Sequence, residues 1–287
     1  MINTRTGIFL FILAWTFIPV MDEIAKYLSS SLPVLQIVWA RYFFTCVLVF
    51  PILINFYRKD SFRSENNILQ IFRGSFLVVA TVCFFYSISI IPLANALALA
   101  FVYPLFVTLL SPFLLNEKVG LRRIVAVIIG FIGVIFIIRP GFVEFNSAFL
   151  AALGTGLSYS LYMISTRKLT NSDTPLKTLA FTGLVGLFAM SIFQPFIWIQ
   201  PTAFEWLLML AMGFVATAGH FLIILSFRYS EASVLAPFSY WEILTNILIG
   251  YYFFDNIPDS WTWVGIFIII GSGIYILLHK KTLKHVK

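Results

Sequence analysis

The chain has 287 residues, of which 60% are hydrophobic, 18% aromatic and 11% charged, and its formal net charge is +7. Soluble domains carry roughly 25% charged residues, so this composition excludes an ordinary soluble protein and makes lipid the expected solvent for most of the surface. The basic residues form short clusters between apolar runs, which excludes a basic domain that holds a duplex, and we expect no nucleic-acid partner.

Ten apolar runs fill nearly the whole chain. A helix needs about 20 residues to cross a hydrocarbon core about 30 Å thick, and helices are expected at 7–28, 33–57, 68–90, 93–115, 121–138, 147–169, 176–199, 203–227, 232–254 and 260–278. Lipid offers a backbone amide no partner outside its own segment, and continuous runs lack the alternation of a membrane barrel. The predicted fold class is therefore an all-α integral membrane protein with ten transmembrane helices.

The first two runs carry charged residues in their outer halves. Asp22 and Lys26 are four residues apart, so they share a helix face and are close enough to pair, and Arg41 follows in the second run. Charge inside a span is costly and needs an explanation. One interpretation is an external gate or solute contact, with Asp22 as ligand or proton carrier and Arg41 as counter-charge. The other is an ion-pair network that holds the two helices together.

The fourth and ninth runs each contain a proline, Pro104 and Pro237, which removes a backbone hydrogen bond from an otherwise continuous helix. The freed carbonyl groups become available to a neighbouring helix, to water or to a solute. Asn95, near the start of the fourth run, can bind a solute or join helix to helix. We expect paired kinks around a site, and the same kinks also aid packing.

Two titratable residues lie near mid-membrane in the eighth and ninth runs. His220 is near the middle of 203–227, either as a structural group or as part of a polar cavity. Glu242 stands eleven residues into 232–254 and is the stronger candidate. Lipid exposure of its ionised form is prohibitive, so we expect Glu242 to face a cavity and to bind solute or couple transport to protons. The alternative is a buried acid bonded to a neighbouring helix.

Aromatic residues with a polar tip lie away from the expected interfaces. Rings that also carry a hydroxyl or an indole N–H suit a flat or amphipathic organic solute, which they can stack upon and hydrogen-bond. The candidates are Trp15, Tyr86, Tyr103, Tyr159, Tyr162 and Tyr240. Glycines at 130, 133, 271 and 273 are expected to allow close packing in the fifth and tenth helices, which we assign to a scaffold or to homodimer contacts.

Several kinds of chemistry find no support in the sequence. Two of the three histidines, His279 and His285, lie in the C-terminal tail, so no metal site is expected, and we predict no cofactor. Cys46 and Cys83 lie inside predicted helices and are expected to pack rather than form a disulfide. A membrane enzyme acting on a lipid or prenyl substrate is the alternative function, but no motif for pyrophosphate or acyl transfer is present.

The basic residues predict the orientation of the helices. Of the 19 Lys and Arg residues, 16 fall on connections or ends that are cytoplasmic if both termini are cytoplasmic, among them Arg73 and the tail at 280–287. Arg139 is on an external connection. This is the positive-inside bias of a multi-pass protein.

The two halves of the chain repeat each other at an offset of 138 residues, which aligns 93–138 with 231–276 without a gap. The acidic turn at 116–118 then meets 254–256, and Gly133 meets Gly271. Each unit has five helices, the first over 7–139 and the second over 147–279. Five is odd, so the second unit must enter the membrane from the opposite side, and such inverted repeats hold a solute site near the midplane.

Four segments carry a resemblance to a known family: ALGTGLSYSLYMISTRKL at 152–169, ANALALAFVYPL at 94–105, NEK at 116–118 and EASVLAP at 231–237. They resemble the EamA repeats of the drug/metabolite transporter superfamily. The resemblance implies a bacterial inner-membrane transporter for a small organic solute, with alternating access around a cavity formed by the first, third, fourth, sixth, eighth and ninth helices. MDEIAKY at 21–27 and QIVWARY at 36–42 are similar to the branch with riboflavin and S-adenosylmethionine carriers.

Overall fold

The computed structural model describes residues 4–57, 64–114, 120–139, 146–169, 173–230, 235–254 and 257–278. All regular structure in these residues is helical, which confirms the all-α prediction. The helices are α1 (Thr4–Leu28), α2 (Val34–Tyr57), α3 (Asn67–Ile90), α4 (Leu93–Ala100), α5 (Tyr103–Leu114), α6 (Leu121–Ile138), α7 (Ser147–Leu169), α8 (Pro175–Ser191), α9 (Gln194–Ile197), α10 (Ala203–Tyr229), the 3-10 helix η2 (Ala236–Tyr240), α12 (Trp241–Phe254) and α13 (Ser260–Leu278).

Among the described residues, six helical segments are long and apolar enough to cross a membrane, so the protein is a multi-pass membrane protein. They are Thr4–Leu28, Val34–Phe56, Asn67–Ile90, Leu93–Leu110, Ser147–Thr166 and Ala203–Tyr229. Two shorter apolar helices, Ile124–Ile138 and Pro175–Ser191, lie between these segments in the chain, and a third, Ser260–Ile276, follows the last of them.

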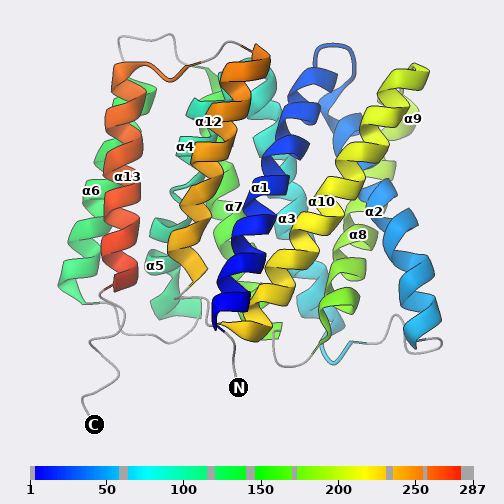
Figure 1. The fold of residues 1–287 in the computed structure, drawn as a ribbon, viewed down its shortest axis with the longest axis horizontal. Coiled ribbons are helices and arrows are strands. Elements are labelled where there is room, and N and C mark those ends of the chain that lie inside the picture. The colour runs from blue at the N-terminus through cyan, green and yellow to red at the C-terminus, as the bar shows by residue number, and fades with distance from the viewer. Residues whose placement is uncertain are drawn as a thin grey trace.

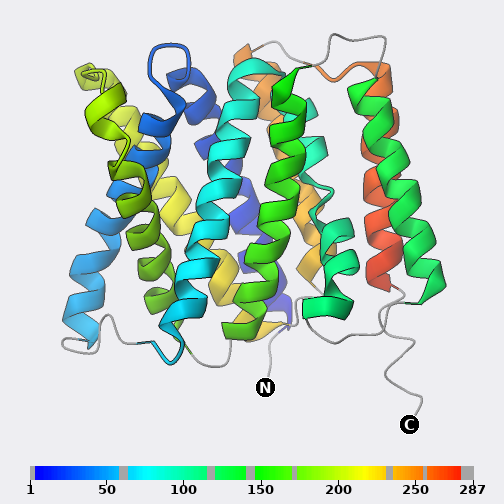
Figure 2. The same cartoon turned by 180° about the vertical axis from the view of Figure 1, so that it is seen from behind.

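The helices stand side by side as one bundle (Figure 1). The closest pairs are α1 with α10, α3 with α7, α6 with α13, and α2 with α8. The α6–α13 pair forms one edge of the bundle, and α2 lies at the opposite edge, as the view from behind also shows (Figure 2). The first turn of α1 and the last turn of α13 lie at the same end of the bundle (Figure 1).

Local signals explain where several helices begin. The Asn66 side chain accepts a hydrogen bond from the backbone N–H of Leu69 at 2.9 Å and caps α3. Thr202 and Glu205 form a reciprocal capping box at the start of α10. These contacts satisfy N–H groups that a helix cannot satisfy within itself.

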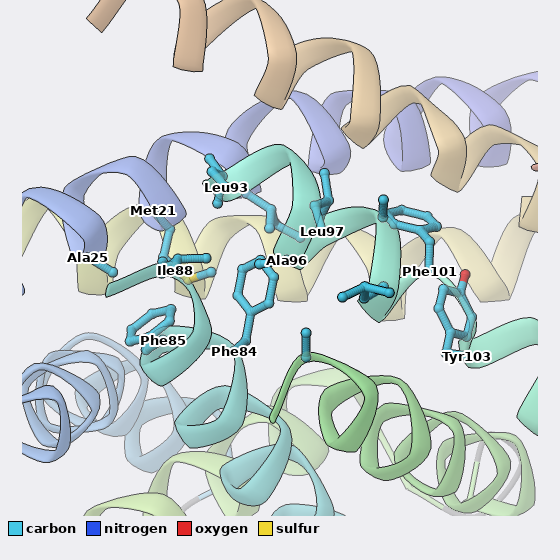
Figure 3. Packing of buried hydrophobic residues seen from close by; sticks show 14 of the residues in the cluster. Met21, Ala25, Phe84, Phe85, Ile88, Leu93, Ala96, Leu97, Phe101 and Tyr103 are labelled. Atoms are coloured by element: carbon cyan, nitrogen blue, oxygen red, sulfur yellow. The ribbon is translucent and has the colours of Figure 1, made fainter. Parts of the chain in front are cut away.

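The fourth expected helix, 93–115, is broken in the structure. α4 ends at Ala100, two residues form a turn, and α5 begins at Tyr103. Pro104 has no N–H to donate to the carbonyl of Ala100, so the helix cannot pass through this point unchanged. The break therefore falls just before Pro104 rather than at it (Figure 3, between Leu97 and Tyr103).

The ninth expected helix, 232–254, is interrupted as well, because 236–240 forms the tighter 3-10 helix η2 with Pro237 in its first turn. Residues 231–234, which carry part of the EASVLAP segment, lie outside the described residues. The seventh helix is expected over 176–199 but is shorter in the structure. α8 ends at Ser191, and the one-turn helix α9 follows with Pro195 at its start. A proline at that position starts a new helix more readily than it continues an old one.

The glycines of the α6–α13 pair behave in two ways. A Cβ atom added at Gly133 would lie 3.0 Å from the carbonyl oxygen of Gly265, so the two backbones approach closely. A Cβ atom added at Gly271 would have no other atom within 4 Å, so the prediction of close packing at Gly271 is wrong. A Cβ at Gly130 would lie 2.6 Å from the Ser272 hydroxyl oxygen, so Gly130, Gly133 and Gly265 are the glycines at which α6 and α13 approach closely.

Candidate functional site

A cavity of about 90 Å³ lies inside the bundle, where α1, α2, α3, α4, α5, α7, α10 and α12 meet. The helices implied by the family resemblance all contribute, and α2 adds Arg41. The lining residues are Trp15, Ile18, Met21, Asp22, Arg41, Leu77, Ala80, Thr81, Phe84, Phe85, Leu97, Ala100, Phe101, Tyr103, Thr155, Tyr159, His220 and Glu242. Figure 3 shows Phe84 and Phe85 on α3 facing Met21 and α4 in this region.

Two carboxyl groups line this cavity from opposite ends of the chain. Asp22 on α1 is 1% exposed, and neither of its carboxylate oxygens has a hydrogen-bond partner among the described residues. Glu242 stands in the first turn of α12, immediately after η2, and is 6% exposed. The break at η2 thus carries Glu242 to the cavity wall, whereas lipid exposure of the same group would be prohibitive.

The expected pair between Asp22 and Lys26 is not formed, because the Asp22 oxygens accept no hydrogen bond within the described part of the chain. Arg41 lines the same cavity as Asp22, but its guanidinium contacts other groups. Asp22 is therefore a buried acid at the cavity wall without a hydrogen-bond partner among the described residues.

Arg41 joins α2 to α3 and α10. One terminal nitrogen donates to the Thr81 hydroxyl and the other lies 2.7 Å from Nε2 of His220. An arginine can only donate, so Nε2 must accept, and the hydrogen of the neutral imidazole is then on Nδ1. That Nδ1 is buried and has no partner among the described residues. His220 therefore offers a free N–H donor at the cavity.

Aromatic side chains form much of the remaining wall. Tyr103 and Tyr159 pack edge to face with ring centroids 5.1 Å apart, and the Tyr103 hydroxyl donates to Ser239 at 3.1 Å. The indole Nε1 of Trp15 is buried with no acceptor in the described segments. The cavity thus combines apolar ring faces with a few unpartnered polar atoms, as expected of an organic-ligand site.

Four predicted site residues lie outside this cavity. The Tyr86 hydroxyl is 2.8 Å from the hydroxyl of Ser147. Asn95 accepts from Thr262 at 3.3 Å and so joins α4 to α13, which is the helix-joining alternative. Tyr240 packs on Phe101 with centroids 5.4 Å apart, and Tyr162 binds Arg73.

Arg73 is counted among the basic residues on connections and helix ends, but in the structure it lies inside a helix and inside the bundle. It lies in α3 and is fully buried. Its guanidinium donates to Thr166 at 2.7 Å, Thr182 at 2.6 Å and the Tyr162 hydroxyl at 2.9 Å. A count of basic residues along connections cannot reveal a cation that turns inward from the first turns of a helix.

Sequence reasoning also missed the apolar wall and two hydroxyls. Thr81 and Thr155 have ordinary neighbours in the sequence, and Phe84, Phe85 and Phe101 are three among 32 phenylalanines. No local signal separates them from residues that face lipid. In the described part of the chain no group of three or more His, Cys, Asp or Glu could hold a metal ion.

A comparison with protein families matches the EamA-like transporter family model twice, over residues 5–139 and again over 146–278. The curated relatives include an S-adenosylmethionine uptake transporter of Rickettsia prowazekii, 26% identical over 96% of this chain and 93% of the relative. A riboflavin transporter of Vibrio cholerae is 27% identical over 90% and 88% of the two chains. A pseudopaline exporter of Pseudomonas aeruginosa is 27% identical over 96% and 98%.

One solved crystal structure superposes on the chain with a TM-score of 0.66, covering 96% of each chain at 20% identity. At this identity the likeness concerns the fold alone. The three relatives described above are transporters of small organic molecules by name, and their named cargoes differ in chemistry.

Proposed function

The chain belongs to the EamA-like transporter family, and from this premise we propose that it moves a zwitterionic organic cation of the S-adenosylmethionine type across the bacterial inner membrane by alternating access. The named relatives support a small-molecule transporter in general. The narrower solute class rests on one observation: an acid, Asp22, and two hydrogen-bond donors, Trp15 Nε1 and His220 Nδ1, line the same aromatic cavity without partners among the described residues.

The charges of the cavity suit a solute that carries both signs. Asp22 and Glu242 provide acidic oxygens for a cationic group, while Arg41 and the free Nδ1–H of His220 provide donors for a carboxylate. Aromatic ring faces such as that of Tyr159 can stack on a flat heterocycle and contact a cation. A neutral flavin would use the rings but would leave the two acids without a counter-charge.

The volume of the cavity supports a moving bundle. Sites for organic ligands of this size usually occupy about 300–1,000 Å³, whereas this cavity measures about 90 Å³. The helices must therefore separate before such a solute enters. The breaks between α4 and α5 and at η2 lie directly beside the cavity, and broken helices are the usual moving or binding elements of carriers with inverted repeats.

The proposed topology has ten membrane spans in two inverted units, 7–139 and 147–279, with both termini in the cytoplasm. It is supported by the double match of the family model and by the common end of the bundle at which α1 begins and α13 ends. The distribution of Lys and Arg supports the same orientation. Protonation of Glu242 is proposed to couple solute movement to protons, and a homodimer through α6 and α13 is an expectation that follows from the sequence.

The direct test is uptake into liposomes that contain the purified protein. Radiolabelled S-adenosylmethionine is expected to enter with saturation, and unlabelled S-adenosylhomocysteine, which lacks the sulfonium charge, should compete at least about tenfold less well, since a charge-assisted contact contributes about 1.5–3 kcal/mol. Riboflavin should not compete. Equal competition by riboflavin, or the absence of saturable uptake, would contradict the proposed solute class.

The role of Glu242 is tested in the same assay. Glu242→Gln keeps the shape of the side chain but cannot ionise, so uptake driven by a pH gradient is expected to be lost while the protein still folds. Glu205→Gln is the matched control, because Glu205 is only partly buried, caps the start of α10 and does not line the cavity. Unchanged pH-driven uptake in Glu242→Gln would remove this residue from coupling.

A further inference from the structure

The polar face of α7 continues beyond the solute cavity. Thr155 and Tyr159 line the cavity, and Tyr162 and Thr166 follow them in the same helix. The spacing of four, three and four residues keeps all four side chains on one face of α7. This face therefore leads from the cavity toward the end of the bundle at which α7 ends.

The facing stretch of α3 is polar at the same end. Gln70 and Arg73 are fully buried, and at helical spacing they precede Leu77 and Thr81, which line the cavity. The Gln70 amide donates to the carboxylate of Asp173, just after α7, at 2.8 Å. The end of α7 and the start of α3 thus lie together, with polar groups between the cavity and this end of the bundle.

Arg73 closes the polar interface. Its guanidinium donates to Thr166 at 2.7 Å and the Tyr162 hydroxyl at 2.9 Å on α7, and to Thr182 at 2.6 Å on α8. These side-chain acceptors are neutral oxygens, and water oxygens can accept the same hydrogen bonds. A second, small cavity of about 10 Å³, room for about one water molecule, is lined by Tyr162, Thr182 and Arg41, and Arg41 lines the solute cavity as well.

The opposite end of the same helix pair is closed by apolar side chains. Phe84, Phe85 and Ile88 on α3 are buried there (Figure 3), and so are Ala148 and Ala152 on α7. Exposing apolar surface to water is unfavourable in proportion to its area. A polar group that exchanges one hydrogen-bond partner for water loses little net free energy. The polar end of the interface is therefore the end better suited to meet water in another conformation.

We propose that the interface of α3 with α7 and α8 is the cytoplasmic half of the solute's path, and that Arg73 with its three side-chain acceptors is the gate that closes this half in the present structure. When α3 separates from α7 and α8, the polar faces line the opening, and water takes over the hydrogen bonds of Arg73. The inference rests on the proposed transport function, but its test measures access to the cavity and requires no knowledge of the solute.

The test is the labelling of a single cysteine in the cavity. Thr155→Cys, with Cys46 and Cys83 replaced by alanine, is treated with a membrane-impermeant methanethiosulfonate reagent in right-side-out and in inside-out vesicles. Glu65 lies just before α3, so the side on which Glu65→Cys reacts in the same vesicles identifies the side of the gate. The rate of labelling from each side is the measured quantity.

Two variants weaken the gate and keep its charge. Thr166→Val and Thr182→Val each remove one acceptor of Arg73 with little change of shape. The lost hydrogen bond exists only in the closed form, so labelling from the side of the gate should become about tenfold faster or more. Ser87→Ala is the control, because the Ser87 hydroxyl joins α3 to the carbonyl of Ala148 on α7, at 2.7 Å, at the opposite end. It should leave this rate unchanged.

Unchanged labelling in both valine variants, with a lower unfolding midpoint, would overturn the proposal, because Arg73 would then be a permanent contact between three helices. Labelling that rises equally from both sides, or as much in Ser87→Ala, would also overturn it, since the bundle would then have loosened as a whole. Faster labelling from the side of the gate alone, without any uptake of S-adenosylmethionine, would support the gate and contradict the proposed solute.

Discussion

Arg41 holds two helices to α2 through two separate nitrogens, one at Thr81 and one at His220. A lysine has a single ammonium nitrogen and cannot donate to both groups from two separate nitrogens. In Arg41→Lys at least one charge-assisted hydrogen bond is lost, which typically costs about 1.5–3 kcal/mol. We expect the KM for solute uptake to rise by about 10- to 100-fold, measured in liposomes.

The control for this substitution is Arg122→Lys, because Arg122 is exposed on α6 and lines neither cavity. Its KM should match that of the unaltered protein. An unchanged KM in Arg41→Lys would show that the fork is not needed for solute binding.

The sequence could identify the charged and polar members of the site but not its walls. Asp22, Glu242 and His220 stand out because titratable groups are rare inside membrane spans. The position of Arg73 near a helix start does not predict that its side chain is buried inside the bundle. Which way such a side chain turns depends on hydroxyls such as that of Thr166, which lies on another helix far along the chain.

The break between α4 and α5 depends on a neighbour in α7. A Cβ added at Gly156 would lie 2.7 Å from a Val102 methyl carbon and 3.0 Å from the carbonyl oxygen of Ala100. Gly156→Ala therefore pushes the break away from α7, and overpacking of this kind typically costs about 1–3 kcal/mol. We expect a lower unfolding midpoint and slower solute uptake.

Gly154 is the matched control for that substitution, because it lies one half-turn away in the same helix. A Cβ there would lie 3.6 Å from the Cys83 sulfur, an ordinary contact. Gly154→Ala should leave uptake unchanged and raise stability by up to about 1 kcal/mol through its better helix propensity. Equal losses in the two variants would contradict a specific role for Gly156 at the break.

A different contact ties α6 to α13 at the membrane surface. Asp259 caps α13 by accepting from the backbone N–H of Thr262 at 2.8 Å, and it pairs with Arg139. Partial burial on its own raises the pKa of Asp259, but the hydrogen bonds from Thr262 and Arg139 lower it more, so the net pKa is below the ordinary value. Asp259 thus stabilises the fold above its unfolded pKa of about 3.9, and the contribution is lost as pH falls through the folded pKa.

Two substitutions separate the cap from the ion pair. Asp259→Asn keeps a capping oxygen and loses the charge. It should lower the free energy of unfolding by well under about 1 kcal/mol, because the Arg139–Asp259 pair is half exposed. It should also remove the loss of stability that protonation of Asp259 causes in acid. Asp259→Ala also loses the cap and should cost about 1 kcal/mol. Unfolding midpoints between pH 6 and pH 3 measure both effects. A steeper acid loss in Asp259→Asn than in the unaltered protein would contradict a lowered pKa for Asp259 in the folded state.

Helix existence was predictable from the sequence, and helix interruption was predictable only in part. Apolar length alone predicts α1, α2, α3 and α7 to within a few residues. The break before Pro104 begins three residues earlier than the proline, because the missing N–H affects a carbonyl one turn back. The end of α8 at Ser191 could not be predicted from the sequence, because the apolar residues continue through α9.

At the scale of the whole molecule, the connections between helices fall at two opposite ends of the bundle. The connection between α1 and α2 and the one between α9 and α10 are at one end, and the last turn of α2 and the first turn of α3 are at the other (Figure 1). The ends of α2 and α9 are also joined directly, because the Gln36 amide donates to the carbonyl of Ile199 at 2.7 Å and accepts from its N–H at 3.0 Å. With both termini in the cytoplasm, as proposed, the end of the bundle that holds the α1–α2 and α9–α10 connections is expected to be the external one.

Single cysteines test that orientation. Ser30, Gln200 and Glu65 are exposed. Ser30 lies between α1 and α2 and Gln200 between α9 and α10, which is the proposed external end, and Glu65 lies just before α3, at the proposed cytoplasmic end. With Cys46 and Cys83 replaced by alanine, we expect Ser30→Cys and Gln200→Cys to react with a membrane-impermeant maleimide in intact cells. Glu65→Cys should react only after permeabilisation. Labelling of Ser30→Cys and Gln200→Cys from different sides would contradict the inverted arrangement of two five-helix units, and labelling of Glu65→Cys alone from outside would reverse the orientation. Because the outcome depends on which side each connection faces and not on transport, it holds whatever the solute is.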